Sequence, residues 1–497
     1  MTTPDSTKTY HEQVKKFFEQ TAETQARQAQ FVQRDSPLNG TVFLLSLVLT
    51  VFQHGTIVLD RLAQAAHQLN PKITVKGGAF KARFNAYAVA FLKTMFAEAL
   101  QLSAPAAPQV VPLLTSFSAV YLLDSSVVTL PDNLKQLFLG CGGAGAQAAA
   151  KVFLLLNWLT GSYESLQLAD GRKADQNMGE PFLPGRQAGA LWLFDLGFFK
   201  AAFLAAIAKA KSFFVCRLPA AQQSFWVRNR AGVLEKFDLD HFLRFAPREL
   251  FEIEVVFGAQ QEVSARLILA PVPKQVAAQR RRKVREAART QRRTPRQRTL
   301  QRCDWTLLLT NARAAQLPTS TVLTVYGVRW QVELTFKLFK SDAKLETTLA
   351  TEQHRVACEF YAKLIAVLVF NRLSGLATEL VAEPLSAVKL WRQMRGDFQA
   401  LLQVLGRGTS AALRELLQFL GRFAQPTRRQ KYPTTRQRLA LAACAACQVK
   451  LNDPLGYLQE KQRDAAPRQQ VCARYLVSYP VTLKPAGLGF QRTIAVP

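Results

Sequence analysis

Residues 326–341 read Tyr-Gly-Val-Arg-Trp-Gln-Val-Glu-Leu-Thr-Phe-Lys-Leu-Phe-Lys-Ser, and this pattern predicts a helix. At about 100° per residue, four polar side chains share a sector of roughly 60° on one side of that helix: Tyr326, Arg329, Glu333 and Lys340. Apolar side chains occupy most of the remaining circumference. The helix is therefore expected to lie in a domain interior.

Glu333 is open to two interpretations. In the first, Arg329 and Glu333 form an ordinary ion pair one turn apart, worth about 0.3–0.5 kcal/mol. In the second, a divalent cation satisfies the carboxylate, and Arg329 and Lys340 lie beside it to receive phosphate oxygens. The spacing alone fits a functional site and a structural ion-pair network equally well.

The four residues follow the Y-(2)-R-(3)-E-(6)-K pattern of one group of DDE transposases from bacterial insertion sequences. The surroundings of the motif also resemble that family, in Trp330, Phe336 and Ser341. Four spaced residues with their context are a specific signal. The resemblance implies a ribonuclease H-like catalytic core, in which two aspartates elsewhere in the chain join Glu333.

The composition supports a large folded protein with a polyanionic partner. The chain has 497 residues, of which 49% are hydrophobic, enough for two to four domains with a sizeable core. Lys and Arg number 64 against 35 Asp and Glu, a formal net charge of +29. Such an excess on a folded chain usually indicates nucleic acid. A generally basic organism or a membrane surface is the alternative.

No signal peptide or membrane span is expected. The N-terminus is polar, and the apolar run 41–52 is too short to cross a bilayer. Seven scattered cysteines make no disulfide framework, which fits a reducing cytoplasm. Cys444 and Cys447 form a CxxC without a second pair, so both are expected to be buried in an Ala-rich helix.

Residues 116–217 predict the core of an α/β protein. Strands are expected at 116–123, 147–157, 162–169, 190–194 and 212–217, with an Ala-rich helix before the last. Asp124 ends the first strand and Asp195 the fourth, the arrangement of a ribonuclease H-like mixed sheet with flanking helices. An aspartate after a strand is, however, more often a helix cap or turn residue than a metal ligand.

The resemblance favours a catalytic role for both aspartates. The segment Asp195-Leu196-Gly197-Phe198 matches the Asp-x-Gly-Phe context of the second aspartate in these transposases. Asp124, followed by two serines, corresponds to the first. Asp132 is its main rival for that position.

A β-rich insertion is expected between Asp195 and Glu333, with strands at 224–228, 250–257 and 262–269. A basic tract follows at 280–302, interrupted only by Glu286. It is predicted to bind DNA backbone, although charge runs are commonly solvated faces or tails. Trp305 then opens a strand, 305–310. It is either a core residue or, as in similar transposases, stacks on a base flipped from the DNA end, worth about 1–3 kcal/mol.

These features divide the chain into five regions: a helical DNA-binding region (1–105), the first part of the core (115–220), the insertion (221–302), the second part of the core (303–350) and a helical C-terminal region (351–497). A helix at 79–100 that opens with Lys81, Arg83 and Asn85 resembles part of a helix-turn-helix, although an ordinary bundle explains it as well. The helix at 10–33 is expected to be exposed, 105–112 to be a linker, and the end of the chain to be an irregular tail.

The prediction is a transposase that performs cut-and-paste DNA transposition, by metal-dependent hydrolysis at element ends followed by strand transfer. Asp124, Asp195 and Glu333 are expected to hold two divalent cations, Mg²⁺ or in its place Mn²⁺, because hard cations prefer oxygen ligands. Five side chains are expected to contact DNA: Tyr326, Arg329, Lys337, Lys340 and Trp305. The resemblance implies a homodimer on double-stranded DNA.

Two other functions stay open. A nuclease with a ribonuclease H-like core would cleave DNA without strand transfer. A basic nucleic-acid-binding protein would do no chemistry, and an inactive copy of a transposase would carry the same motifs.

Overall fold

The computed structural model describes residues 6–102, 110–141, 146–219, 224–258, 263–381, 385–397, 400–401, 403–404, 408–425, 433–463 and 474–481. The chain forms two compact units. The first comprises Met1–Gln109, Asp124–Lys173 and Gln331–Arg428, and the second comprises Val110–Leu123, Ala174–Trp330 and Arg429–Pro497. Each unit is therefore assembled from three separate stretches of the chain.

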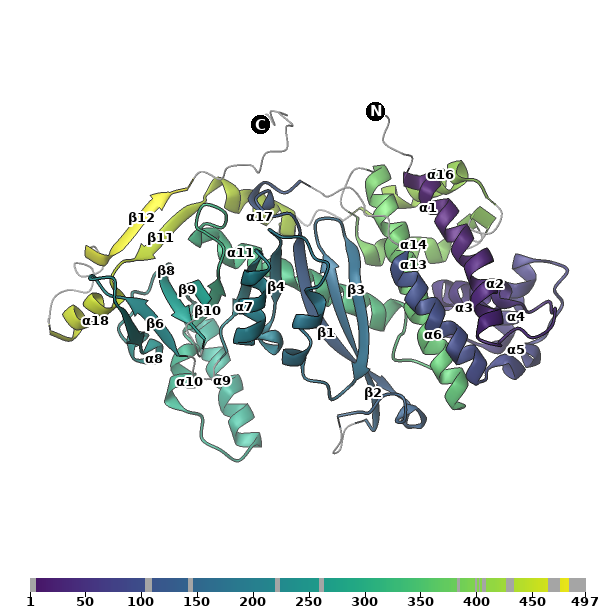
Figure 1. The fold of residues 1–497 in the computed structure, drawn as a ribbon, viewed down its shortest axis with the longest axis horizontal. Helices are drawn as coiled ribbons and strands as arrows, with labels where there is room; N and C mark the ends of the chain where they lie inside the picture. The colour runs from purple at the N-terminus through teal and green to yellow at the C-terminus, as the bar shows by residue number, and fades with distance from the viewer. Residues whose placement is uncertain are drawn as a thin grey trace. The chain divides into compact units, whose positions relative to one another are not determined.

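The second unit is built on a mixed sheet (Figure 1). Its strands, in order across the sheet, are β12 (Leu476–Pro480), β11 (Cys447–Leu451), β8 (Phe251–Phe257), β9 (Val263–Pro271), β10 (Trp305–Thr310), β5 (Phe213–Arg217), β4 (Leu191–Phe194) and the first residues of β1 (Val120–Leu130). β1, β4 and β5 run parallel, whereas β8, β9, β10 and β5 alternate in direction. A hairpin of β6 (Phe225–Arg228) and β7 (Leu234–Phe237) pairs with β8.

Helices of the second unit flank this sheet. They are α7 (Ala201–Lys209), α8 (Leu239–Phe242), α9 (Lys274–Thr290), α10 (Gln297–Arg302), α11 (Val322–Tyr326), α17 (Thr435–Cys444) and α18 (Pro454–Arg463). All four residues of β4, Leu-Trp-Leu-Phe, are buried. A continuous apolar run of this kind is expected where a parallel strand is covered on both faces.

The first unit is mainly helical. Its α-helices are α1 (Ser6–Lys15), α2 (Ala22–Gln28), α3 (Gly40–His54), α4 (Leu59–Leu69), α5 (Gly77–Arg83), α6 (Ala86–Gln101), α12 (Trp330–Lys337), α13 (Gln353–Val381), α14 (Ala387–Gly396) and α16 (Ser410–Phe423). It also holds the remainder of β1 and an antiparallel pair, β2 (Ala148–Asn157) and β3 (Ser162–Asp170).

The strand order confirms the predicted ribonuclease H-like sheet. β1 passes through both units, and the hydrogen-bonded order around it is β3-β2-β1-β4-β5. β2 and β3 are antiparallel, while β1, β4 and β5 are parallel, with α7 as the crossover between β4 and β5. The five core strands occur where the sequence predicts them, apart from the longer extent of β1.

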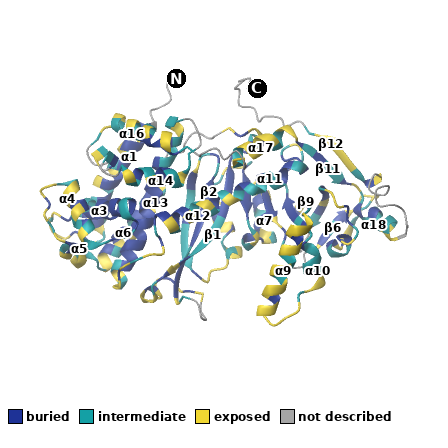
Figure 2. Cartoon of the chain, turned by 180° about the vertical axis from the view of Figure 1, so that it is seen from behind, coloured by how far each residue is buried: buried dark blue, intermediate teal, exposed yellow. Residues whose placement is uncertain are grey.

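α13 is the core helix of the first unit. By length and composition it could cross a membrane, and so could α3 with α4, which are bent by 113°, if they are counted as one span. α13 packs against α3, α6 and α16, and most of it is buried (Figure 2). It carries a buried Lys363, whose Nζ donates to the carbonyl oxygens of Lys344, at 3.0 Å, and Thr347. Burial lowers the pKa of Lys363 to about 8. The packing of α13 inside the first unit explains its apolar composition. The two hydrogen bonds satisfy its buried Lys363.

Two expectations for the N-terminal region are wrong. The helix at 10–33 is not simply exposed, because it buries an apolar face that includes Tyr10, Val14 and Phe17. The single helix expected at 79–100 is two helices, α5 and α6, separated at 84–85. Residues 103–109, which contain most of the expected linker, lie outside the described residues.

The second half of the chain also differs from expectation. The basic tract is helical, forming much of α9 and α10 within a region expected to be β-rich. The expected irregular tail contains β11, α18 and β12. Cys444 is exposed at the end of α17 and Cys447 begins β11, so neither is a buried helical residue.

Candidate active site

Asp124 and Asp195 are positioned by two parallel strands. The register of β1 and β4 pairs Val120 with Leu191 and ends with Leu123 opposite Phe194. Asp124 and Asp195 are the residues that directly follow this last pair, and both are half-buried. β1 does not end at Asp124, as the sequence suggested, but continues to Leu130. The parallel register therefore ends one residue before each aspartate.

Asp195 caps a short 3₁₀-helix, Leu196–Phe198. Its Oδ1 accepts a hydrogen bond from the backbone N–H of Gly197 at 2.8 Å. A Cβ at Gly197 would lie 2.7 Å from Asp175 Oδ2 and 3.1 Å from Asp195 Oδ1. A larger residue at this position would therefore have to displace one or both carboxylates. Asp175 is an acid at this site that sequence reasoning missed, since nothing in the loop before β4 marks it.

Tyr326 and Arg329 belong to the second unit, as does Asp195. The Tyr326 hydroxyl donates to the carbonyl oxygen of Phe194, the residue before Asp195, at 3.3 Å. Burial raises the pKa of Tyr326, so the phenol stays protonated at neutral pH. The guanidinium carbon of Arg329 lies 5.9 Å from the centroid of the Tyr326 ring. Asp195, Tyr326 and Arg329 thus form one group of predicted site residues.

Glu333, Lys337 and Lys340 belong to the first unit, as does Asp124. Glu333 is half-buried in α12, and Lys337 is exposed. Lys340 lies in a π-helical turn, Leu338–Asp342. Its Nζ donates to the carbonyl oxygen of Val127 at 2.6 Å and forms an ion pair with Glu346 at 2.8 Å. Because Val127 follows Asp124 on β1, Lys340 is fixed to the strand that carries Asp124.

The segment 326–341 is helical throughout, but it is not one regular α-helix. A 3₁₀ turn, Gly327–Arg329, precedes α12 and a π turn follows it, so the angle per residue varies along the segment. The expectation that the helix lies in a domain interior holds for only one side of it. Trp330 is 56% exposed and Leu334 is 41% exposed. The buried side is formed by Val332, Phe336, Leu338 and Phe339.

Trp305 occupies the position of a core residue, one of the two roles that the sequence left open. It is only 3% exposed. Its ring contacts Phe251 edge-on, and the Arg248 guanidinium lies over it at 5.1 Å from the centroid. Stacking on a flipped base would require the indole to leave these contacts, so this structure does not present Trp305 to DNA.

The chemistry of the three predicted ligands fits a hard divalent cation, because each supplies carboxylate oxygens. Among the described residues, however, no group of three or more His, Cys, Asp or Glu side chains is placed to hold a metal ion. The joining of Asp124, Asp195 and Glu333 around one centre therefore stays a prediction.

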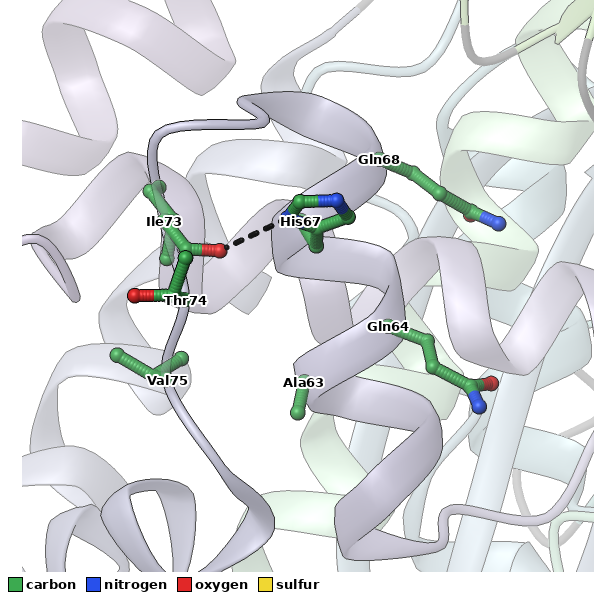
Figure 3. Close-up of a pocket in the computed structure, with 7 residues that line it drawn as sticks. All are labelled: Ala63, Gln64, His67, Gln68, Ile73, Thr74 and Val75. Carbon is green, nitrogen blue, oxygen red and sulfur yellow. Dashed lines mark hydrogen bonds between the residues drawn. The ribbon is translucent and has the colours of Figure 1, made fainter.

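A pocket of about 400 Å³ lies elsewhere, in the first unit, between α4 and the segment that follows it. Its lining comprises Ala63, Gln64, His67, Gln68, Ile73, Thr74 and Val75 (Figure 3). His67 Nδ1 lies 3.1 Å from the carbonyl oxygen of Ile73, which joins the two sides of the pocket. No predicted site residue lines it.

A ribonuclease H-like sheet, with one aspartate within β1 and another directly after β4, is the kind of core that the resemblance to DDE transposases implies. The family described as "Transposase DDE domain" matches residues 115–369, and the chain belongs to this family. The prediction of a DDE transposase of the bacterial insertion-sequence type is confirmed. Enzymes of this family act on DNA and depend on divalent metal ions.

Several similar proteins are also named as transposases. The chain is 26% identical over 373 residues to the transposase for insertion sequence element IS1151 from Clostridium perfringens, covering 72% of this chain and 78% of that protein. It is 24% identical over 357 residues to the transposase for insertion sequence element IS231F from Bacillus thuringiensis subsp. israelensis, covering 69% and 74%. Among solved structures, the piggyBac transposase synaptic complex with hairpin DNA aligns over 87% of this chain and 88% of that chain, with 10% identity and a TM-score of 0.43.

Proposed function

We propose that this transposase moves DNA by a cut-and-paste route, in which it hydrolyses phosphodiester bonds at the element ends and then joins those ends to target DNA. The main support is the register of β1 and β4, which ends at Leu123 and Phe194 and leaves Asp124 and Asp195 as the next residues. We also propose a homodimer on double-stranded DNA, as the resemblance implies, and a cytoplasmic location, which the scattered cysteines favour.

Asp124, Asp195 and Glu333 are proposed to hold two Mg²⁺ ions, which Mn²⁺ can replace. Such ions supply an activated nucleophile and charge stabilisation at the leaving oxygen. The chain supplies the carboxylates, and hydrogen bonds hold the segments that carry two of them. Asp195 is fixed by its bond to Gly197, and the Asp124 strand is fixed by the bond from Lys340 to Val127.

The neighbouring cations are proposed to hold the DNA end. An ammonium group has three donors, and Lys340 directs its Nζ to Val127 and Glu346, which leaves capacity for one phosphate oxygen. Lys337 is exposed and can contact phosphate directly. Tyr326 is proposed to position the end through its hydroxyl. It is unsuited to proton abstraction, because burial keeps the phenol protonated.

Substitution of each proposed ligand tests this assignment. The variants Asp124→Asn, Asp195→Asn and Glu333→Gln should lose end cleavage with Mg²⁺ and with Mn²⁺. Each should still bind element ends in a gel shift within about twofold of wild type, since each substitution is nearly isosteric and removes only charge. Loss of end binding in Glu333→Gln would show that Glu333 is structural.

Asp132→Asn is the matched control. Asp132 is the sequence rival of Asp124, and it lies exposed in a 3₁₀ turn, Asp132–Leu134. This variant should cleave at the wild-type rate. Cleavage retained in Asp124→Asn but lost in Asp132→Asn would move the first ligand to Asp132.

Strand transfer separates the proposal from a simple nuclease. A precut element end, supplied with target DNA and Mg²⁺, should be joined by the wild-type protein and not by Glu333→Gln. Cleavage of intact ends without any joining of precut ends would favour the nuclease.

A further inference from the structure

The basic tract folds into a helical hairpin, which we call the basic arm and define as residues 274–302. α9 and α10 lie side by side and are joined by residues 291–296 (Figure 1). Ala277 and Ala288 are the only buried residues of α9 among those described, and none is buried in α10. Much of the arm is exposed (Figure 2). Burial of an apolar face therefore contributes little to the stability of the arm.

Three arginines attach the base of the arm to the rest of the second unit. Arg280 donates to the carbonyl oxygen of Trp305 at 2.8 Å and to Thr306 Oγ1 at 3.1 Å. Arg281 forms an ion pair with Asp304. Arg302 pairs with Asp240 at 2.6 Å and is only 9% exposed. These cations have structural roles and hold the arm to β10 and α8.

The far part of the arm has a different set of cations. Six exposed residues make no hydrogen bond or ion pair through their side chains to any described residue: Lys283, Arg285, Arg289, Arg292, Arg293 and Arg296. Glu286, the only acid in the tract, is paired with Arg282 at 2.8 Å. These exposed cations repel one another, and a polyanionic partner would relieve that repulsion.

We infer that the basic arm binds the phosphate backbone of double-stranded DNA without reading its sequence, an inference that rests on the proposed function for its choice of partner. Duplex DNA is a continuous polyanion, which can neutralise several cations along a rigid arm. The cations do not share one helix face, because Lys283 and Arg285 lie about 160° apart around α9. A recognition helix directs one face into a groove, whereas cations on several sides suit phosphate contacts.

The test compares two fourfold variants of the full chain. In the arm variant, glutamine replaces four cations of the arm: Lys283, Arg285, Arg289 and Arg293. In the control variant, glutamine replaces four exposed cations elsewhere in the second unit: Lys209, Lys236, Arg244 and Arg313. Both variants have the same net charge, and neither alters the attachment at Arg280, Arg281 and Arg302. Binding to a 30-base-pair duplex that lacks element sequence is measured by fluorescence anisotropy across a salt series.

The arm variant should bind at least tenfold more weakly at low salt. Its plot of log affinity against log salt should be shallower by about 2–4 units, since each phosphate contact contributes about 0.9. The control variant should change affinity less than twofold, and both should unfold at the wild-type temperature. An unchanged salt slope in the arm variant, or an equal loss in the control, would overturn the inference. No cleavage is measured, so this outcome is independent of the Asp124, Asp195 and Glu333 tests.

Discussion

At the scale of single residues, the small size of Gly197 is as important to the proposed active site as the charges of its acids. Asp175 and Asp195 both approach Gly197, and the missing side chain makes room for them. Neither the spacing of the acids nor their charges reveals this requirement. The glycine of the Asp-x-Gly segment is therefore explained by a close approach of two carboxylates rather than by a special backbone angle.

Gly197→Ala should displace the Asp195 carboxylate, because the new Cβ would lie 2.7 Å from Asp175 Oδ2 and 3.1 Å from Asp195 Oδ1. Overpacking of this kind typically costs about 1–3 kcal/mol. We expect end cleavage, measured in single turnover, to fall at least tenfold while end binding is retained. Gly78→Ala is the control, since nothing lies within 4 Å of a Cβ at Gly78. Equal cleavage by Gly197→Ala and wild type would show that the loop adjusts freely.

At the scale of elements, the break between α5 and α6 changes the interpretation of the expected helix-turn-helix. Arg83 directs its guanidinium to the carbonyl oxygens of Phe31, at 3.3 Å, and Leu38, and it lies over the Phe31 ring. Asn85 caps α6 by accepting a hydrogen bond from the N–H of Ala88 at 3.0 Å. Two of the three side chains proposed to approach DNA therefore stabilise the helical unit.

Asn85→Ala should lower the free energy of unfolding of the first unit by about 1 kcal/mol, because it removes the N-cap of α6. Asn85→Asp keeps an acceptor at the same position and should retain most of the stability. Urea unfolding measures both, and gel shifts measure end binding. If Asn85 read bases instead, both variants would lose end affinity, whatever their stability.

At the scale of the whole chain, distant stretches complete one sheet. β11 and β12, near the end of the chain, extend the sheet of the second unit beside β8. The fully buried Glu252 on β8 accepts hydrogen bonds from Gln448 on β11 at 2.8 Å, from Thr319 at 2.7 Å and from Arg266 at 3.0 Å. A buried carboxylate needs such partners, so the C-terminal strands are part of the core rather than a tail.

Gln448→Met should destabilise the second unit by about 1–3 kcal/mol, because it removes a donor from a buried carboxylate. Lys450→Met on the same strand should cost less than about 1 kcal/mol, since Lys450 pairs with an exposed Glu254. Differential scanning fluorimetry of both variants measures the difference. Equal melting temperatures would mean that Glu252 finds another partner in place of Gln448.

The amino-acid sequence alone is sufficient to predict the family, the catalytic candidates and the core strands. These follow from local signals: the spacing from Tyr326 to Lys340, the segment Asp195–Phe198, and apolar runs such as β4 whose composition requires burial on both faces. Such signals lie within a few residues of one another, so the chain can be interpreted without knowing its tertiary contacts.

The contacts between distant residues are what reveal which polar side chains stabilise the fold. The structure pairs Leu123 with Phe194, the residues before Asp124 and Asp195, brings Asp175 and Asp195 together at Gly197, and buries Trp305. The structure also distinguishes the arginines that attach the basic arm from the exposed arginines in its far part. These outcomes depend on contacts between residues far apart in the chain, and composition and periodicity carry no information about them.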